Sequence, residues 1–194
     1  MSLLSRFKAT ARMAARFHGH RAARFHGHRS GSAAVEFALV APMFFALLFA
    51  IIETGLVFFA SQSLETALQD SARTIMTGEA QITNLTKQSF KANIVCANVN
   101  VLFDCENGIY IDVQSYPSGF GSVRISDPIL GGSFVDNTQY NPGGPGDIVI
   151  VRLFYQWPLF VTGLGYNIAN LSGSKRLLSA TAAFKNEPYP APSS

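Results

Sequence analysis

Two carboxylates stand at the ends of an otherwise apolar stretch of the sequence. Glu36 precedes residues 37–52, which are all apolar, Ala or Pro, and Glu53 separates them from a second apolar run at 56–60. A charged side chain inside a bilayer is costly and is usually retained for a function. Such a carboxylate either pairs with a positive charge or reaches to the membrane surface, where it needs no partner. Charge pairing is therefore the chemistry that these positions offer.

A long helix is the element that must position both carboxylates. Residues 37–60 correspond to about 36 Å of helix at roughly 1.5 Å per residue, enough to cross a hydrocarbon core of about 30 Å. Beyond this run, apolar residues recur at helical spacing at Leu64, Leu68, Ala72 and Ile75. The spacing predicts an amphipathic continuation of the same helix, with Gly78 as its terminator. Two helices with a break near 61–63 are the alternative.

Charge is distributed unevenly along the chain. Residues 1–31 hold seven of the 15 Lys and Arg residues and all four His residues, whereas all 12 Asp and Glu residues lie beyond them. A basic segment directly before an apolar helix predicts a cytoplasmic N-terminus and an exported remainder. A cleaved signal peptide is disfavoured, because Phe58 stands where a cut after Ala60 needs a small residue. An uncleaved signal anchor fits the hydropathy equally well.

The basic segment repeats the sequence AARFHGHR at 14–21 and 22–29. Its His-Gly-His pairs are of a type that binds Zn, Cu or Ni, and its arginines are of a type that contacts nucleic acid. Eight residues are too few for a structural repeat, and no other ligating residues lie nearby. We therefore expect a disposable leader without a metal site, and its position directly before the apolar run favours a cytoplasmic anchor over nucleic-acid binding. A membrane-tethered metal or nucleic-acid binder that uses these His and Arg residues is an alternative that requires the leader to be retained.

The order of basic segment, Gly31, small residues, Glu36 and apolar helix resembles the leader and cleavage site of type IV prepilins. Within that class, GSAAVEFALVAPMFFALLFAIIETG resembles the start of TadE-like pseudopilins of the tight-adherence (Tad/Flp) pilus system. These proteins often carry a second Glu where Glu53 stands. The resemblance covers residues 29–77. It implies that a prepilin peptidase cuts after Gly31, so that Ser32 becomes the first residue and Glu36 the fifth.

The resemblance suggests a role for Glu36. A new ammonium group on Ser32 would lie about one helical turn, near 6 Å of rise, from Glu36. In a filament this carboxylate would pair with the Ser32 amine of a neighbouring subunit, and a subunit out of register would leave the charge unpaired. We expect Glu36 to set filament register. Glu53 is expected near the periplasmic membrane surface, where interfacial solvation is the simpler interpretation and a contact with a second helix is the alternative.

The exported part contains the only two cysteines, Cys96 and Cys105. Their position on the exported side and their spacing of nine residues predict one disulfide, in preference to two free thiols or half of a metal site. A short helix capped by Thr83 or Asn84 is expected just before Cys96.

The remaining patterns predict a small antiparallel sheet. Alternation indicates a half-buried strand over 109–114, and a β-branched and aromatic run indicates a central strand over 147–157 that ends at Pro158. Alternation also favours strand over helix within 174–187, and the Gly/Pro-rich segment 131–146 is expected to be a loop. The predicted fold class is α+β, a long pilin-like helix with a transmembrane first half followed by a small periplasmic domain with a short helix and an antiparallel sheet.

No catalytic constellation is recognisable in the exported part, which has no His and no nucleophile elbow. Its GGPGD sequence at 143–147 lacks the Lys and Ser/Thr of a phosphate loop. We therefore expect no enzyme activity and no cofactor. The expected organisation is a leader over 1–31, a transmembrane helix over 32–60 and a periplasmic domain over 61–194.

These observations and the resemblance together predict a structural pseudopilin of the bacterial inner membrane. It would act in pilus assembly, adhesion and surface colonisation. Its expected partners are the prepilin peptidase, other Tad pilins and pseudopilins, the inner-membrane assembly platform and the lipid bilayer. The alternative function is an unprocessed, single-pass periplasmic scaffold or binding protein.

Overall fold

The computed structural model describes residues 30–99, 102–162 and 166–190. The chain divides into two compact units, Met1–Phe45 and Ala46–Ser194, and each is described by itself. The duplicated His/Arg segment lies outside the described residues.

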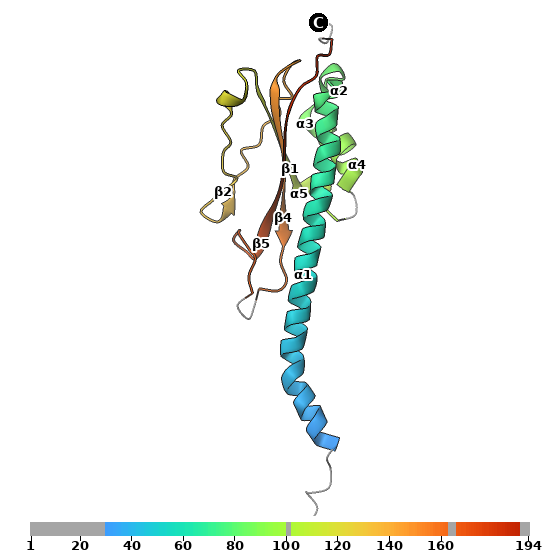
Figure 1. Cartoon of the computed structure of the whole chain (residues 1–194), viewed down its shortest axis with the longest axis vertical. Coiled ribbons are helices and arrows are strands. Elements are labelled where there is room, and N and C mark those ends of the chain that lie inside the picture. Colours follow the sequence, from blue (N-terminus) through green and yellow to red (C-terminus); the bar gives the residue numbers. More distant parts are fainter. Residues whose placement is uncertain (1–29, 100–101, 163–165, 191–194) are drawn as a thin grey trace, which may run out of the picture. The chain divides into compact units, whose positions relative to one another are not determined.

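The predicted long helix is α1 (Ser30–Met76), which contains the whole apolar run (Figure 1). The alternative of two helices with a break near residue 61 is wrong. The hydroxyl of Ser61 donates to the Val57 carbonyl at 2.9 Å, and that of Thr66 donates to the Gln62 carbonyl at 3.0 Å. Because these hydroxyl groups bond to the preceding turn, they are satisfied without interrupting the helix.

The helix ends where the sequence predicts. Gly78 has a φ of 82°, and its N–H donates to the Ile75 carbonyl at 3.0 Å, as expected for a glycine just beyond a helix. The ring of Tyr189 packs directly against this glycine, so that a Cβ added here would lie 2.3 Å from the ring. Gly78 therefore provides both the left-handed backbone and the space for the C-terminal segment.

Short helical elements follow α1. They are α2 (Glu79–Ile82), α3 (Lys87–Phe90), the π-helical η1 (Lys91–Val95), α4 (Cys96–Val99) and α5 (Cys105–Gly108). A helix before Cys96 was expected, but its predicted cap at Thr83 or Asn84 is wrong. Thr86 caps α3, and its hydroxyl oxygen accepts a hydrogen bond from the Ser89 N–H at 3.2 Å. Asn84 instead has a left-handed φ of 50° after the end of α2.

Three antiparallel strands form the main sheet in the order β1-β4-β5. They are β1 (Ile109–Tyr116), β4 (Ile148–Pro158) and β5 (Lys175–Lys185). The predictions of a strand at 109–114, a central strand ending at Pro158 and a strand within 174–187 are confirmed. The first seven residues of β4 are buried, as expected for a β-branched strand with neighbours on both sides.

A second, two-stranded sheet precedes β4 and was not predicted. β2 (Ile129–Leu130) pairs with β3 (Ser133–Phe134) through Gly131 and Gly132, whose φ values are 58° and 75°. Two glycines with positive φ are what a tight hairpin turn requires. The expected loop over 131–146 is therefore wrong at its start. A 3₁₀ turn, η2 (Phe120–Ser122), lies between β1 and this hairpin.

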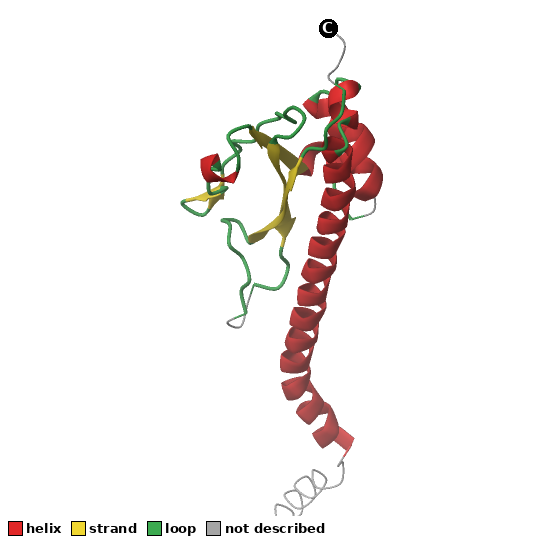
Figure 2. Cartoon of the chain, turned by 45° about the horizontal axis from the view of Figure 1, so that its top comes forward, coloured by secondary structure: helices red, strands yellow, loops and turns green. Residues whose placement is uncertain are grey.

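The unit Ala46–Ser194 has a hydrophobic core on each face of the main sheet. One core joins residues of α1 and the short helices to Ile109, Ile111, Val113, Val149, Val151, Leu153, Leu178 and Ala180. The opposite core contains Phe154, Leu171 and Leu177, with Phe134 of β3 packed against them. Figure 2 shows α1 and the short helices that follow it on one side of the sheet, and η2 with the β2–β3 hairpin on the other. The predicted α+β class is confirmed.

Candidate functional site: the carboxylates of the N-terminal helix

Glu36 is exposed near the start of α1. The Ser32 hydroxyl donates to its Oε1 at 3.1 Å, so the two residues that the prepilin resemblance singles out lie one helical turn apart and in contact. Gly31 precedes them, and no atom would lie within 4 Å of a Cβ added there. The carboxylate is thus presented on an open helix surface.

Large apolar side chains cover the first half of α1 and are exposed. In the first unit they are Val35, Phe37, Leu39, Val40, Met43, Phe44 and Phe45. In the second unit they are Leu47, Leu48, Phe49, Ile51, Ile52, Leu56, Phe58 and Phe59. An exposed apolar surface of this extent is unfavourable in water. By length and composition, α1 fits a single-pass membrane anchor.

Glu53 lies in the apolar part of α1 but is only 5% exposed. Its carboxylate accepts hydrogen bonds from the backbone N–H groups of Phe160 and Val161, the latter at 3.1 Å and 3.2 Å to its two oxygens. Both residues belong to the connection between β4 and β5. The sequence led to two interpretations of Glu53, interfacial solvation and a contact with a second helix. Neither interpretation includes the observed hydrogen bonds from backbone amides of the same chain.

The next residue of α1 makes a second contact with the same connection. The hydroxyl groups of Thr54 and Tyr166 are hydrogen-bonded to each other, and Thr54 Oγ1 also bonds to the Ala50 carbonyl at 2.8 Å. One feature of the sequence indicates that the connection between β4 and β5 packs against another part of the protein. Residues 157–174 contain no charged side chain, which is unusual for a loop exposed to water.

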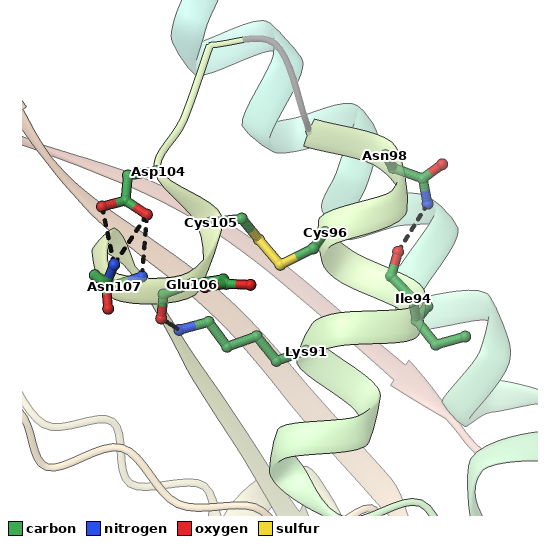
Figure 3. The surroundings of a disulfide bond; sticks show 8 residues. All are labelled: Lys91, Ile94, Cys96, Asn98, Asp104, Cys105, Glu106 and Asn107. Carbon is green, nitrogen blue, oxygen red and sulfur yellow. Dashed lines mark hydrogen bonds between the residues drawn. A yellow bond between two sulfur atoms is a disulfide. The ribbon is translucent and has the colours of Figure 1, made fainter.

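The predicted disulfide between Cys96 and Cys105 is confirmed (Figure 3). It joins the first residues of α4 and α5, whose Cα atoms are 5.6 Å apart. Lys91 Nζ donates to the Glu106 carbonyl at 2.8 Å beside the bridge, and burial is the main cause that lowers the Lys91 pKa. The bridge and this hydrogen bond hold α5 against η1 and α4, directly before β1 begins.

Sequence reasoning missed a buried ion pair on the sheet. Asp112 of β1 faces Arg152 of β4, and the two side chains are 1% and 8% exposed. Arg152 Nη2 and Nε donate to Asp112 Oδ2 at 2.6 Å and 3.0 Å. The same carboxylate accepts the Gln139 N–H at 2.8 Å and both of its oxygens accept Gln114 Nε2. The pair therefore connects two strands to the segment that covers the outer face of the sheet.

The described residues contain no cluster of three or more His, Cys, Asp or Glu side chains arranged to hold a metal ion. Burial raises the pKa of Tyr140 to about 12, and the Tyr140 hydroxyl is buried without a hydrogen-bond partner among the described residues. Burial is also the main cause that raises the Tyr189 pKa. Burial within the folded domain is thus the main cause of both shifts.

Comparison with known proteins relates the N-terminal helix of this chain to a known family. No curated protein and no solved structure matches this chain. Residues 31–73, all within α1, match the family model described as TadE-like protein, which confirms the resemblance and identifies the N-terminal segment of this chain as TadE-like, consistent with a protein of the Tad pilus system.

Proposed function

We propose that this protein is a structural pseudopilin of a Tad/Flp-type pilus. It is inserted in the inner membrane through α1 and processed by a prepilin peptidase after Gly31. In this proposal residues 1–31 are the leader, 32–60 span the membrane and 61–194 form the periplasmic domain. The observation that carries the proposal is that the TadE-like match starts at Gly31 and runs through the apolar helix that bears Glu36.

The geometry near Gly31 supports a role for Glu36 in assembly. In the described structure the Ser32 hydroxyl is its hydrogen-bond donor, 3.1 Å away. Cleavage after Gly31 would add a positive charge to the same residue. Along a filament, that amine and the Glu36 carboxylate of a neighbouring subunit would neutralise each other in an apolar environment, where an unpaired carboxylate is strongly disfavoured. Only subunits in the correct axial register would form the pair.

The partners in this proposal are the prepilin peptidase, other Tad pilins and pseudopilins and the assembly platform of the inner membrane. The N-terminus would lie in the cytoplasm and the disulfide-bonded domain in the periplasm, where a disulfide persists. Pili built with this subunit would serve adhesion and surface colonisation.

The isosteric change Glu36→Gln tests the assembly role. We expect it to abolish incorporation into pili, measured as subunit recovered in sheared pili, while the amount in the membrane fraction stays unchanged. Glu65→Gln is the matched control, because Glu65 lies on the same helix beyond the apolar run, where its Oε1 accepts a hydrogen bond from Gln69 Nε2 at 3.1 Å. Pili of normal number and composition from the Glu36→Gln strain would contradict the register role.

The second candidate is an unprocessed membrane-anchored scaffold. It requires only α1 and the folded domain, and the contact between Glu53 and Val161 would exist in either case. The two functions differ at the N-terminus, since the scaffold retains its leader and its activity does not depend on a prepilin peptidase. Deletion of the peptidase gene is expected to abolish assembly under the first function and to have no effect under the second.

A further inference from the structure

The connection between β4 and β5 has the composition of a membrane-contacting segment. Residues 157–174 contain no Asp, Glu, Lys, Arg or His, and Lys175 and Arg176 follow immediately. Phe160 in this connection is 83% exposed, more than Met43 at 78% or Leu39 at 76% on the apolar surface of α1. An uncharged segment with an exposed aromatic residue and flanking cations is typical of a polypeptide at the boundary of a bilayer.

This connection is attached to α1 within the apolar run. Glu53 accepts the N–H groups of Phe160 and Val161, and the hydroxyl groups of Thr54 and Tyr166 bond to each other. Figures 1 and 2 show the connection at the end of the main sheet that lies away from α2. Phe160 is therefore held beside the part of α1 where exposed apolar residues precede and follow Glu53.

The contact also accounts for an acid inside an apolar run. A carboxylate at this depth loses water, and its cost falls only if hydrogen-bond donors replace that water. The backbone N–H groups of Phe160 and Val161 supply those donors, which explains why Glu53 is 5% exposed yet has partners for both of its oxygens. The same hydrogen bonds fix the direction in which Phe160 projects.

We propose that the start of the β4–β5 connection, residues 159–162, is a second membrane contact of this protein, in which Phe160 enters the interfacial layer of the bilayer and Glu53 holds it there. The inference rests on the proposed membrane insertion of α1. A lipid surface is favoured over a protein partner because the exposed apolar side chains of α1 and Phe160 form neighbouring surfaces. Lys175 and Arg176 would meet anionic headgroups, and the aromatic residue Tyr166 suits the interface.

A single-tryptophan experiment with the full chain tests this placement. Trp157, the only Trp of the chain, is replaced by Phe, and Phe160→Trp is introduced. The protein is reconstituted in vesicles of phosphatidylcholine and phosphatidylglycerol. We expect blue-shifted emission that is quenched by brominated phosphatidylcholine and protected from aqueous acrylamide. Phe120→Trp in the same background is the matched control, because Phe120 is 65% exposed on η2, and it should be quenched by acrylamide alone.

The possible failures are distinguishable. Vesicle flotation reports insertion independently, and a chain that does not float would overturn the proposed membrane function and this inference with it. A floating chain whose Trp at 160 responds like the control would overturn the inference alone, as would blue-shifted emission without quenching by brominated lipid, which would indicate a protein partner. The variant Glu53→Gln tests whether the hydrogen bonds of Glu53 hold Phe160 in place. We expect normal flotation with weaker quenching by brominated lipid at position 160, and unchanged quenching would refute the role of Glu53.

Discussion

The change Asp112→Ala tests the main structural element that the sequence did not reveal. Asp112 is 1% exposed and accepts hydrogen bonds from Arg152, Gln139 and Gln114. Without the carboxylate, the guanidinium of Arg152 stays buried with the Ser126 carbonyl at 3.0 Å and the face of the Phe154 ring, 5.2 Å from its centroid, as its remaining contacts. The N–H of Gln139 loses its acceptor as well.

The expected loss in the free energy of unfolding follows from the Arg152 guanidinium and the Gln139 N–H, which lose their acceptor. Removal of one partner of a buried ion pair typically costs about 3–5 kcal/mol, because the other charge remains buried and unpaired. Domains of this kind are stable by about 5–15 kcal/mol, so the variant is expected to lose a large fraction of its free energy of unfolding. The double variant Asp112→Ala/Arg152→Met removes the orphaned charge together with its partner, and it should recover most of the loss.

Urea unfolding of the full chain in detergent measures these differences. Trp157 reports the transition, since its ring lies 6.0 Å from that of Phe103 in the core between α1 and the sheet. Asp70→Ala is the control, because Asp70 is exposed on α1 and its removal should change the free energy of unfolding by less than about 0.5 kcal/mol. A loss below about 1 kcal/mol for Asp112→Ala, or a double variant no more stable than the single one, would show that Arg152 does not depend on Asp112 for its burial.

Two further predictions concern the stability of the folded domain. Because burial raises the Tyr140 pKa to about 12, the folded state retains a proton that the unfolded state loses near pH 10, so stability should fall from about pH 10 to pH 12. Tyr140→Phe should remove this part of the pH dependence in alkaline urea titrations, and an identical pH profile would contradict it. Gly78→Ala should destabilise more than Gly119→Ala, because both glycines have a φ near 83° but a Cβ meets a neighbour, the Tyr189 ring, only at Gly78. Equal midpoints in thermal unfolding would show that the Tyr189 ring moves away from an added Cβ without a loss of stability.

The elements with strong periodicity could be predicted from the sequence. The apolar run and the helical spacing from Leu64 to Ile75 specify α1, and the β-branched composition of 148–154 specifies the central strand β4. The disulfide followed from two cysteines in an exported segment. In each case, one local signal decides the structure.

The missed features depend on contacts between distant segments. Asp112 lies on the polar side of an alternating strand, which predicts exposure, but the segment 117–140 returns to cover that face. The partner of Glu53 is 107 residues away, and spacing along the chain does not reveal it. The β2–β3 hairpin is different, since Gly131-Gly132 between apolar residues is a recognisable two-residue turn that the overall Gly/Pro content of the segment obscured.

We propose that the carboxylate at the start of the apolar helix is retained because proteolysis supplies an amine to pair with it. Intact-mass and N-terminal sequence analysis of the protein from membranes and from sheared pili will show whether that amine exists. We expect a chain that starts at Ser32 in the pili, and a precursor with its leader in membranes of a strain that lacks the peptidase. A functional protein that still carries residues 1–31 would rule out pairing between Glu36 and a Ser32 amine.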